Sequence, residues 1–268
     1  MTASKHPAMP SDSRAFVSSF ARGLKVIESF GPDNRSMTLA QVAERTGVDR
    51  AVARRLLLTL VHLGFVHVHE RRFELTTHVL RLAYSFLSSA GLGASLQPFL
   101  DSLAREIRET VSISVLDEAE VVFVARSDIP GRRLAYVVTT GMRLPAFSSA
   151  SGRMLLAHRP IADVKKLLAR TRIVRLTRRT VVNQAEIIKA IAAARRDGHA
   201  LNYEETEDDL IGIAVPVFNR AGLMVAALNA SASAARTDEA RLQGEILPRM
   251  KTTAGRLTSM LPCPPGTI

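Results

Sequence analysis

The stretch that most constrains the fold is GVDRAVARRLLLTLVHLGFVHV, residues 47–68, because charged and apolar residues are segregated along one predicted helix. Arg50, Arg54 and Arg55 occupy the front of this helix, and an almost wholly apolar run follows. Gly64 then interrupts the helical pattern, and the sequence resumes with residues typical of a β-strand. The apolar stripe that we expect to face the core consists of Val52, Leu56, Leu60 and Leu63, widened by Leu57 and Val61.

Segments on either side of this helix predict two further helices and a hairpin. SSFARGLKVIESF is amphipathic, with an apolar side made of Phe20, Leu24, Val26 and Ile27. TLAQVAERTG predicts a second helix that Thr38 caps, with Gln41 three residues later as in a capping box and Gly47 at its end. Asp49 is placed to cap the third helix, and FVHVHERRFEL predicts two short strands joined by a basic turn.

Three helices followed by a hairpin predict a winged helix-turn-helix that binds double-stranded DNA. A helix in the major groove presents hydrogen-bond donors at its leading end and packs its rear against its neighbours, which is the division seen here. The alternative is that these arginines are simply the solvated face of an amphipathic helix. The candidate DNA-contacting residues are Arg50, Ala51, Arg54 and Arg55 on the third helix, Thr38 before it, and Arg71 and Arg72 in the wing.

The rest of the chain predicts an α+β domain with an antiparallel sheet. A fourth helix over 76–90 precedes GLGASL, where we place the boundary between domains. We expect strands in VSISVLDEAEVVFVARS, RLAYVVTT, LIGIAVPVF and LMVAALNAS, and helices in QPFLDSLAREIRET, SSASGRMLLA, ADVKKLLAR, NQAEIIKAIAAARRDG and the segment that runs to about Met260.

The net charge of +11 does not by itself argue for DNA binding. Residues 132–180 contain 12 Lys or Arg and 1 Asp or Glu, so this one segment has a net charge equal to that of the whole chain. The segment lies far along the sequence from the helix that carries Arg50, Arg54 and Arg55. No apolar run is long enough to span a bilayer, and the single Cys263 excludes an internal disulfide framework. A cytoplasmic location is therefore expected, with no cofactor.

Residues 16–88 resemble the winged helix-turn-helix of the IclR family of bacterial transcriptional regulators, on RGLKVIESF, TLAQVAERTGVDRAVARRLLLTLVHLGFV and FELTTHVLRLAYSFL. The second half resembles the family's GAF-like effector-binding domain, on GMRLPAFSSASGRMLLA and GHALNYEETEDDLIGIAVPVFNRAGLMVAALNAS. The resemblance implies an arm at 1–15, a DNA-binding domain at 16–75, a linker helix at 76–94, an effector domain at 95–262 and a tail at 263–268. RLPAFSS, LTRRT and LPRM are most similar to the branch that controls aromatic-acid catabolism.

The same resemblance implies an effector site for a small aromatic or other organic acid, and a protein that associates with itself as a dimer or a pair of dimers. Asn202, Gly212 and Asp209 depart from the family pattern, where an acid or Ser, a Cys, Ser or Ala, and a Gly are usual. The implied effector-binding residues are Phe147, Ser148, Ser149, Ala150, Ser151, Gly152, Asn202, Glu205, Gly212, Asn229 and Ser231.

Other functions have weaker support in the sequence. His62, His67 and His69 could suggest a metal site, but a zinc site needs about four converging ligands and exposed histidines of a wing are the simpler interpretation. The acidic run at 204–209 could supply a carboxylate pair for an enzyme, although a solvated loop is the expected explanation. An enzyme acting on a small acid, and a sensor that signals through protein partners, remain as alternative functions.

Overall fold

The computed structural model describes residues 15–89, 91–92, 94–129 and 139–261, and these divide into two compact units at residues 86 and 87. The expected arm, the tail and most of the strand expected at RLAYVVTT lie outside the described residues. Each unit is described separately below.

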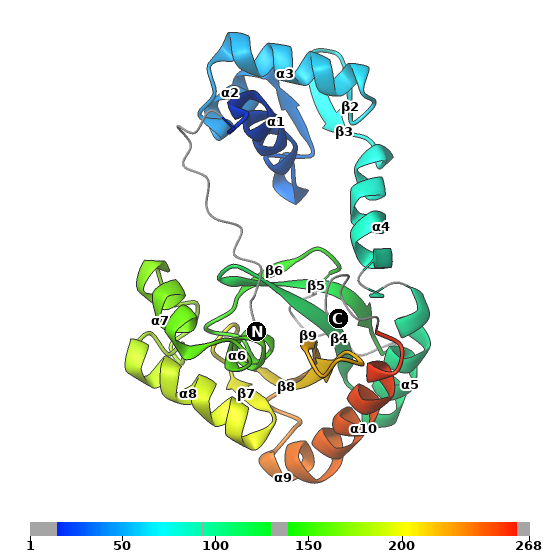
Figure 1. Ribbon diagram of the computed structural model, residues 1–268, viewed down its shortest axis with the longest axis vertical. Coiled ribbons are helices and arrows are strands. Elements are labelled where there is room, and N and C mark those ends of the chain that lie inside the picture. The colour runs from blue at the N-terminus through cyan, green and yellow to red at the C-terminus, as the bar shows by residue number, and fades with distance from the viewer. Residues whose placement is uncertain (1–14, 90, 93, 130–138, 262–268) are drawn as a thin grey trace. The chain divides into compact units, whose positions relative to one another are not determined.

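The N-terminal unit contains the three expected helices and the expected hairpin (Figure 1). The capping box of α2 is present as predicted, because Thr38 Oγ1 accepts from Gln41 N at 3.4 Å and Thr38 N donates to Gln41 Oε1 at 2.9 Å. Its elements are α1 (Ser18–Glu28), β1 (Ser36–Thr38), α2 (Leu39–Thr46), α3 (Arg50–His62), β2 (Val66–His69) and β3 (Arg72–Leu75).

The strand β1 was not expected from the sequence. It pairs antiparallel with β3, so the wing is a three-stranded sheet in the order β1-β3-β2. The core of the unit joins all these elements. It consists of Val26, Met37, Val42, Leu57, Leu60, Val66 and Phe73.

The buried stripe of α3 agrees with the predicted one except at its end. Leu57 and Leu60 are buried and Leu56 and Val61 pack against the core, as predicted, whereas Leu63 is 54% exposed. The reason is that α3 ends at His62 and the chain turns away at Gly64, which has a φ of +80°.

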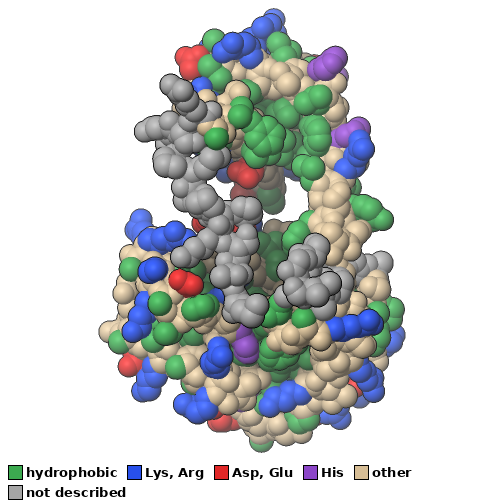
Figure 2. All heavy atoms as spheres, in the orientation of Figure 1, with side chains coloured by type: hydrophobic (Ala, Val, Ile, Leu, Met, Phe, Trp, Pro, Cys, Tyr) green, Lys and Arg blue, Asp and Glu red, His purple; other side chains and the backbone are tan. Residues whose placement is uncertain are grey.

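Two other helices expose residues that were expected to be buried. On α1 only Val26 is fully buried, and Phe20 is 68% exposed. The predicted fourth helix begins as a 3₁₀ turn, Thr77–Val79, and continues as α4 (Leu80–Ser89), which has no buried residue among those described. Figure 2 shows hydrophobic side chains at the surface over α1 and along α4.

A six-stranded antiparallel sheet forms the second unit, in the order β6-β5-β4-β9-β8-β7. The short strands β6 and β7 at its two edges were not expected from the sequence. The strands are β4 (Thr110–Asp117), β5 (Glu120–Ser127), β6 (Arg143–Pro145), β7 (Ala200–Tyr203), β8 (Leu210–Phe218) and β9 (Met224–Ser233).

Helices cover both faces of this sheet. One face packs against α5 (Gln97–Ile107) and α10 (Leu247–Thr258), which continues from α9 (Glu239–Arg241) through a π-helical turn, Leu242–Ile246. The other face, called the inner face below, packs against α6 (Ala150–Ala157), α7 (Ile161–Arg170) and α8 (Gln184–Asp197). The arrangement is α+β, as predicted.

Candidate functional sites

The N-terminus of α3 presents a cluster of cations to solvent. Arg50, Arg54 and Arg55 are exposed, and none has an ion-pair or side-chain hydrogen-bond partner among the residues that the structure describes. Asp49 caps the helix by accepting from Ala51 N at 2.8 Å. A cation in the first turn of a helix opposes the helix dipole, so Arg50 does not serve the stability of α3.

In the wing, two basic residues that were expected to act together have different environments. Arg71 is exposed at the tip, where it and Glu70 have positive φ values of 66° and 47°, as in a tight hairpin turn. Arg72 instead donates from Nε to Ser36 Oγ at 2.9 Å and from its terminal nitrogen to Ser36 O. Arg72 therefore ties β3 to β1, which leaves Arg71 as the wing cation best placed for an external ligand.

In the second unit, α6 lies on the inner face and every one of its residues is buried. Ser149 caps it by accepting from Gly152 N at 3.1 Å. A Cβ at Gly152 would lie 2.1 Å from Ala146 O, a contact with backbone that no side chain can relieve. Glycine at this position therefore allows the start of α6 to fold back on the segment before it, which holds Phe147 fully buried.

A buried ion pair fixes this segment to its neighbours. Arg153 and Glu205 are 4% and 6% exposed, and the two terminal nitrogens of Arg153 donate to the two carboxylate oxygens of Glu205. Arg153 Nε also donates to Phe147 O at 2.9 Å, and Val181 N donates to Glu205 Oε2 at 3.0 Å. The carboxylate of Glu205 is thus engaged inside the protein, and its contact with an effector stays a prediction.

Asn202 has a similar internal role. Its Nδ2 donates to Ser148 O at 2.6 Å, and its Oδ1 accepts from Glu205 N at 2.9 Å. Asn202 therefore positions the start of α6 relative to the loop after β7. The family resemblance implied Asn202 and Glu205 as effector-binding residues. The lone charged residue of α6, Arg153, was the signal that explains their internal contacts, and it was not used.

Three other candidates do come together beneath the start of α6. Asn229 Nδ2 donates to Ser231 Oγ at 3.0 Å, and both side chains are less than a tenth exposed. Gly212 lies beside them, because a Cβ there would be 3.5 Å from Ala150 Cβ and 3.7 Å from Asn229 Oδ1. The glycine keeps open a space that an alanine side chain would occupy.

Sequence reasoning missed the polar residues of β4 and β5 on this face. Ser112 of β4 is paired with Asn229 on one side and with Arg126 of β5 on the other. Ser114, two residues further along β4, is fully buried, and its hydroxyl has no hydrogen-bond partner among the described residues. The alternation of serine with Val and Ile in VSISV was the available signal, since hydroxyls at every second position of a buried strand lie on one face.

Asp209, which stands where the family usually has glycine, has a φ of +61°. Its carboxylate accepts from Ala235 N at 2.8 Å and from Ser233 Oγ at 2.8 Å. The hydrogen bond from Ala235 N, and after it the bond from Ser233, lower the pKa of Asp209. Asp209 keeps the left-handed backbone conformation that glycine adopts freely. Its side chain is also hydrogen-bonded to Ser233 and to the loop after β9.

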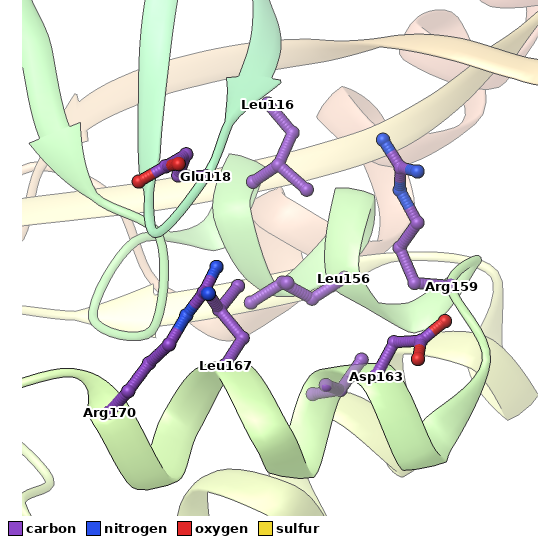
Figure 3. A pocket seen from close by; sticks show the side chains of 8 residues that line it. Leu116, Glu118, Leu156, Arg159, Asp163, Leu167 and Arg170 are labelled. Atoms are coloured by element: carbon purple, nitrogen blue, oxygen red, sulfur yellow. The ribbon is translucent and has the colours of Figure 1, made fainter. Parts of the chain in front are cut away.

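A separate cavity of about 230 Å³ lies on the far side of α6, bounded by α7 and the turn between β4 and β5. Figure 3 shows Leu116, Leu156 and Leu167 projecting into it, with Arg159 and Arg170 at opposite sides. None of the residues expected to bind the effector lines this cavity.

The basic segment at 132–180 divides into paired and unpaired charges. Arg143 pairs with Asp117 and Glu120, Arg153 with Glu205, and Arg179 with Glu204 at 3.0 Å. The hydrogen bond with Asp117, and next the one with Glu120, raise the pKa of Arg143. The other cations of the described part are exposed surface residues, Arg159, Lys165, Lys166, Arg170, Arg172, Arg175 and Arg178.

Over residues 15–261, apart from the stretches that the structure leaves undescribed, no group of three or more His, Cys, Asp or Glu side chains could hold a metal ion. No helix there is long and apolar enough to cross a membrane.

Comparison with known families decides which protein class combines these two units. The sequence pattern described as "Bacterial transcriptional regulator IclR C-terminal" matches residues 84–259, and that of the IclR helix-turn-helix domain matches residues 19–70. The chain belongs to the IclR family. This IclR regulator is 38% identical, over 96% of its own length and 97% of the relative's, to the p-hydroxybenzoate hydroxylase transcriptional activator of Acinetobacter baylyi.

Solved structures show the same relationship. A transcriptional regulator of Rhodococcus sp. RHA1 is 41% identical and superposes with a TM-score of 0.79, covering 92% of this chain and 98% of the other. The inducer-binding domain of Acinetobacter PobR, solved as a double mutant with 3-hydroxybenzoic acid, is 34% identical with a TM-score of 0.58, over 62% of this chain and 96% of that domain. These proteins and the family are transcriptional regulators rather than enzymes, and they are related to regulators of aromatic-acid metabolism.

Proposed function

We propose that this IclR regulator binds operator DNA through α3 and that a small aromatic acid, bound on the inner face beneath α6, changes that binding. The observation that carries the first part is the position of Arg50, Arg54 and Arg55, which are exposed and without partners in the described structure at a helix N-terminus. Phosphates and guanine edges supply the acceptors that three unpaired guanidinium groups lack within the protein.

The remaining DNA contacts follow from the positions of their elements. Ala51 is exposed on the leading turn of α3, where a small side chain allows close approach to a base. Thr38 lies at the start of α2, whose N-terminal backbone can face a phosphate. Arg71 at the wing tip reaches the backbone or minor groove, and Arg72 holds the wing against β1.

The regulator acts as a dimer, and two such dimers can associate through the same surfaces. On α4, Leu80 and Tyr84 are 62% and 72% exposed and lie four residues apart, hence on one side of the helix. Contiguous exposed apolar surface of this kind marks an interface, and a second copy of this chain would place two α3 helices on the half-sites of a palindrome.

The effector class follows from the site and from the relatives. Ser148, Ser151, Asn229 and Ser231 supply hydroxyl and amide groups beneath α6, with Phe147 at the start of that helix and Gly212 leaving space. The relatives named above regulate p-hydroxybenzoate hydroxylase or bind 3-hydroxybenzoic acid. The proposed targets are the genes of a protocatechuate or hydroxybenzoate pathway. Effector binding is coupled to DNA binding through the linker at 76–94. The protein acts in the cytoplasm, where the operator DNA is.

The test is a titration of the purified full-length chain with DNA from upstream of its own gene and of neighbouring catabolic genes, with and without 4-hydroxybenzoate. We expect a protected palindrome with half-sites about 10 bp apart, and an affinity that changes when 4-hydroxybenzoate is added. Tyr84→Asp should shift the protein toward monomer and weaken operator binding. Retained binding of 4-hydroxybenzoate without any specific DNA binding would contradict the proposal and favour a sensor that signals through protein partners.

A further inference from the structure

A cavity of about 550 Å³ lies between the end of α6, the start of α7 and the C-terminal half of α8. It adjoins the smaller cavity of Figure 3, with which it shares Leu156 and Arg159. Pockets that bind small molecules usually measure about 300–1,000 Å³, and this cavity falls within that range. None of the residues expected to bind the aromatic-acid effector lines it. It is therefore a candidate ligand site distinct from the region beneath α6.

Most of the lining of this cavity is aliphatic. Leu156 and Ile191 are buried, whereas Ile161 is 50% exposed, so the cavity has a closed floor and an apolar rim. The other apolar residues of the lining are Ala157, Pro160 and Ala192. No aromatic, hydroxyl or amide side chain belongs to the described lining. A polar substituent buried against these residues would lose its hydrogen bonds to water, so the lining suits a plain hydrocarbon chain.

The charged residues of the lining are all arginines. Arg196 is neutralised by Asp197, which accepts from its Nε at 2.8 Å and from its Nη2 at 3.0 Å. Arg195 is held by a neutral group, because its Nη1 donates to Ala157 O at 2.8 Å, and it has no carboxylate partner in the described structure. Arg159 has no side-chain partner among the described residues. Two positive charges beside an apolar floor are thus left without a counter-charge from the described protein.

The start of α7 adds to the positive potential at this end. The helix begins at Ile161 without a side-chain cap, and a helix N-terminus favours a nearby anion. The smaller cavity on the other side of Arg159 differs in charge, because Glu118 and Asp163 line it together with Arg159 and Arg170. The larger cavity has no acidic residue in its described lining. Of the two cavities, the larger one therefore has the charge that suits an anion.

We propose that this cavity binds a medium-chain fatty acid, with the carboxylate between Arg159 and Arg195 and the hydrocarbon chain against the aliphatic lining. A hydrogen bond from a charged donor is about twice as strong as a neutral one, so the two guanidinium groups select a carboxylate over an uncharged head. A cavity of about 150 Å³ already holds benzene, so an acid with a single ring would leave most of this cavity unfilled. A longer chain also gains free energy with each methylene that it withdraws from water.

The test is isothermal titration of the full-length protein with three probes: octanoate, the uncharged octanamide, and acetate, which lacks the chain. The wild-type protein should bind octanoate at least about tenfold more tightly than either other probe, because only octanoate has both the charge and the chain. The double variant Arg159→Gln with Arg195→Gln should bind octanoate no more tightly than octanamide. Its affinity for octanamide should stay close to that of the wild type, because the aliphatic lining is unchanged.

Two further variants serve as controls. Arg159→Gln breaks no side-chain contact in the described structure, so it should lower the preference for octanoate even if loss of the Arg195 contact destabilises the double variant. Lys189→Gln with Arg172→Gln removes the same charge from exposed positions outside the lining, one of them on α8. This control should leave the affinities for all three probes unchanged.

Three results of these titrations would overturn the proposal: no binding of octanoate by the wild type, equal binding of octanoate and octanamide, or an equal loss in the control double variant. Displacement of octanoate by 4-hydroxybenzoate would place octanoate in the effector site and would overturn it as well. Failure of 4-hydroxybenzoate to bind would contradict the proposed function alone, because the Arg159 and Arg195 variants still decide whether this cavity binds octanoate.

Discussion

Arginine has opposite roles in the two units. On α3, Arg50 and Arg54 are exposed and unpartnered in the described structure, and Arg50 lies in the first turn, where a cation is unfavourable. In α6, Arg153 is 4% exposed, with a bidentate pair to Glu205 and a further bond to Phe147 O. The difference teaches that residue type alone does not identify a ligand contact. An arginine whose donors are satisfied internally positions the site, whereas one left unsatisfied at the surface is available to a partner.

The largest effect should come from breaking the internal pair. Arg153→Met leaves the Glu205 carboxylate buried without its cation, and removal of one partner of a buried pair costs about 3–5 kcal/mol. Differential scanning calorimetry of the full-length protein should show a lower melting temperature for the effector domain.

A double substitution separates the pair from simple loss of packing. Arg153→Met with Glu205→Leu should recover much of the lost stability, because a well-packed apolar pair avoids the cost of burying an uncompensated charge. A double variant as unstable as the sum of the two single variants would show that the two side chains are not energetically coupled.

A smaller effect, on ligand binding and not on the fold, is expected at Gly212. The added Cβ of Gly212→Ala would make ordinary contacts with Ala150 and Asn229, so the melting temperature should stay near wild type. The methyl group occupies space beside Asn229, and we expect about tenfold weaker binding of 4-hydroxybenzoate. Gly152→Ala is the matched contrast, since its Cβ would meet backbone at 2.1 Å and should destabilise the domain itself.

The smallest effect concerns acid sensitivity. The pKa of Asp209 is lowered in the folded protein, first by Ala235 N and then by Ser233, so its carboxylate favours the fold at pH values above the unfolded pKa. That contribution is lost as pH falls through the folded pKa. Melting temperatures of wild type and Asp209→Asn should therefore differ slightly at neutral pH and converge in acid. A gap that persists unchanged in acid would contradict this assignment.

The sequence predicted elements better than it predicted the roles of single residues. Caps were readable because they depend on residues within one turn, and Thr38 and Asp49 cap α2 and α3 as expected. The strands β1 and β6 were missed because three residues are too few to establish a period. The strand β7 is as long as β2 and β3, but those two were recognised together with the turn that joins them. The stripe of α3 was predicted except for Leu63, which is exposed because the helix ends at His62.

The arrangement of the residues proposed for the effector site was also predicted only in part, because contacts between distant segments decide it. The resemblance located Gly212, Asn229 and Ser231, which do lie together. It could not reveal that Glu205 pairs with Arg153 and that Asn202 bonds to Ser148, because these partners are 52 and 54 residues away in sequence. Ser112 was recognised as part of the same face only once strand register placed it opposite Asn229.

The most direct test of the central claim, that the α3 arginines are kept for DNA, is operator affinity measured by fluorescence anisotropy over a range of salt concentrations. Arg54→Ala should weaken binding by about 1–3 kcal/mol, and a lost phosphate contact should reduce the salt slope by about 1, while the melting temperature stays at the wild-type value. Arg172→Ala, which removes an exposed arginine from the basic segment of the other unit, is the matched control and should leave affinity unchanged. Unaltered operator affinity in Arg54→Ala and in Arg50→Ala, or an equal loss in Arg172→Ala, would contradict the account.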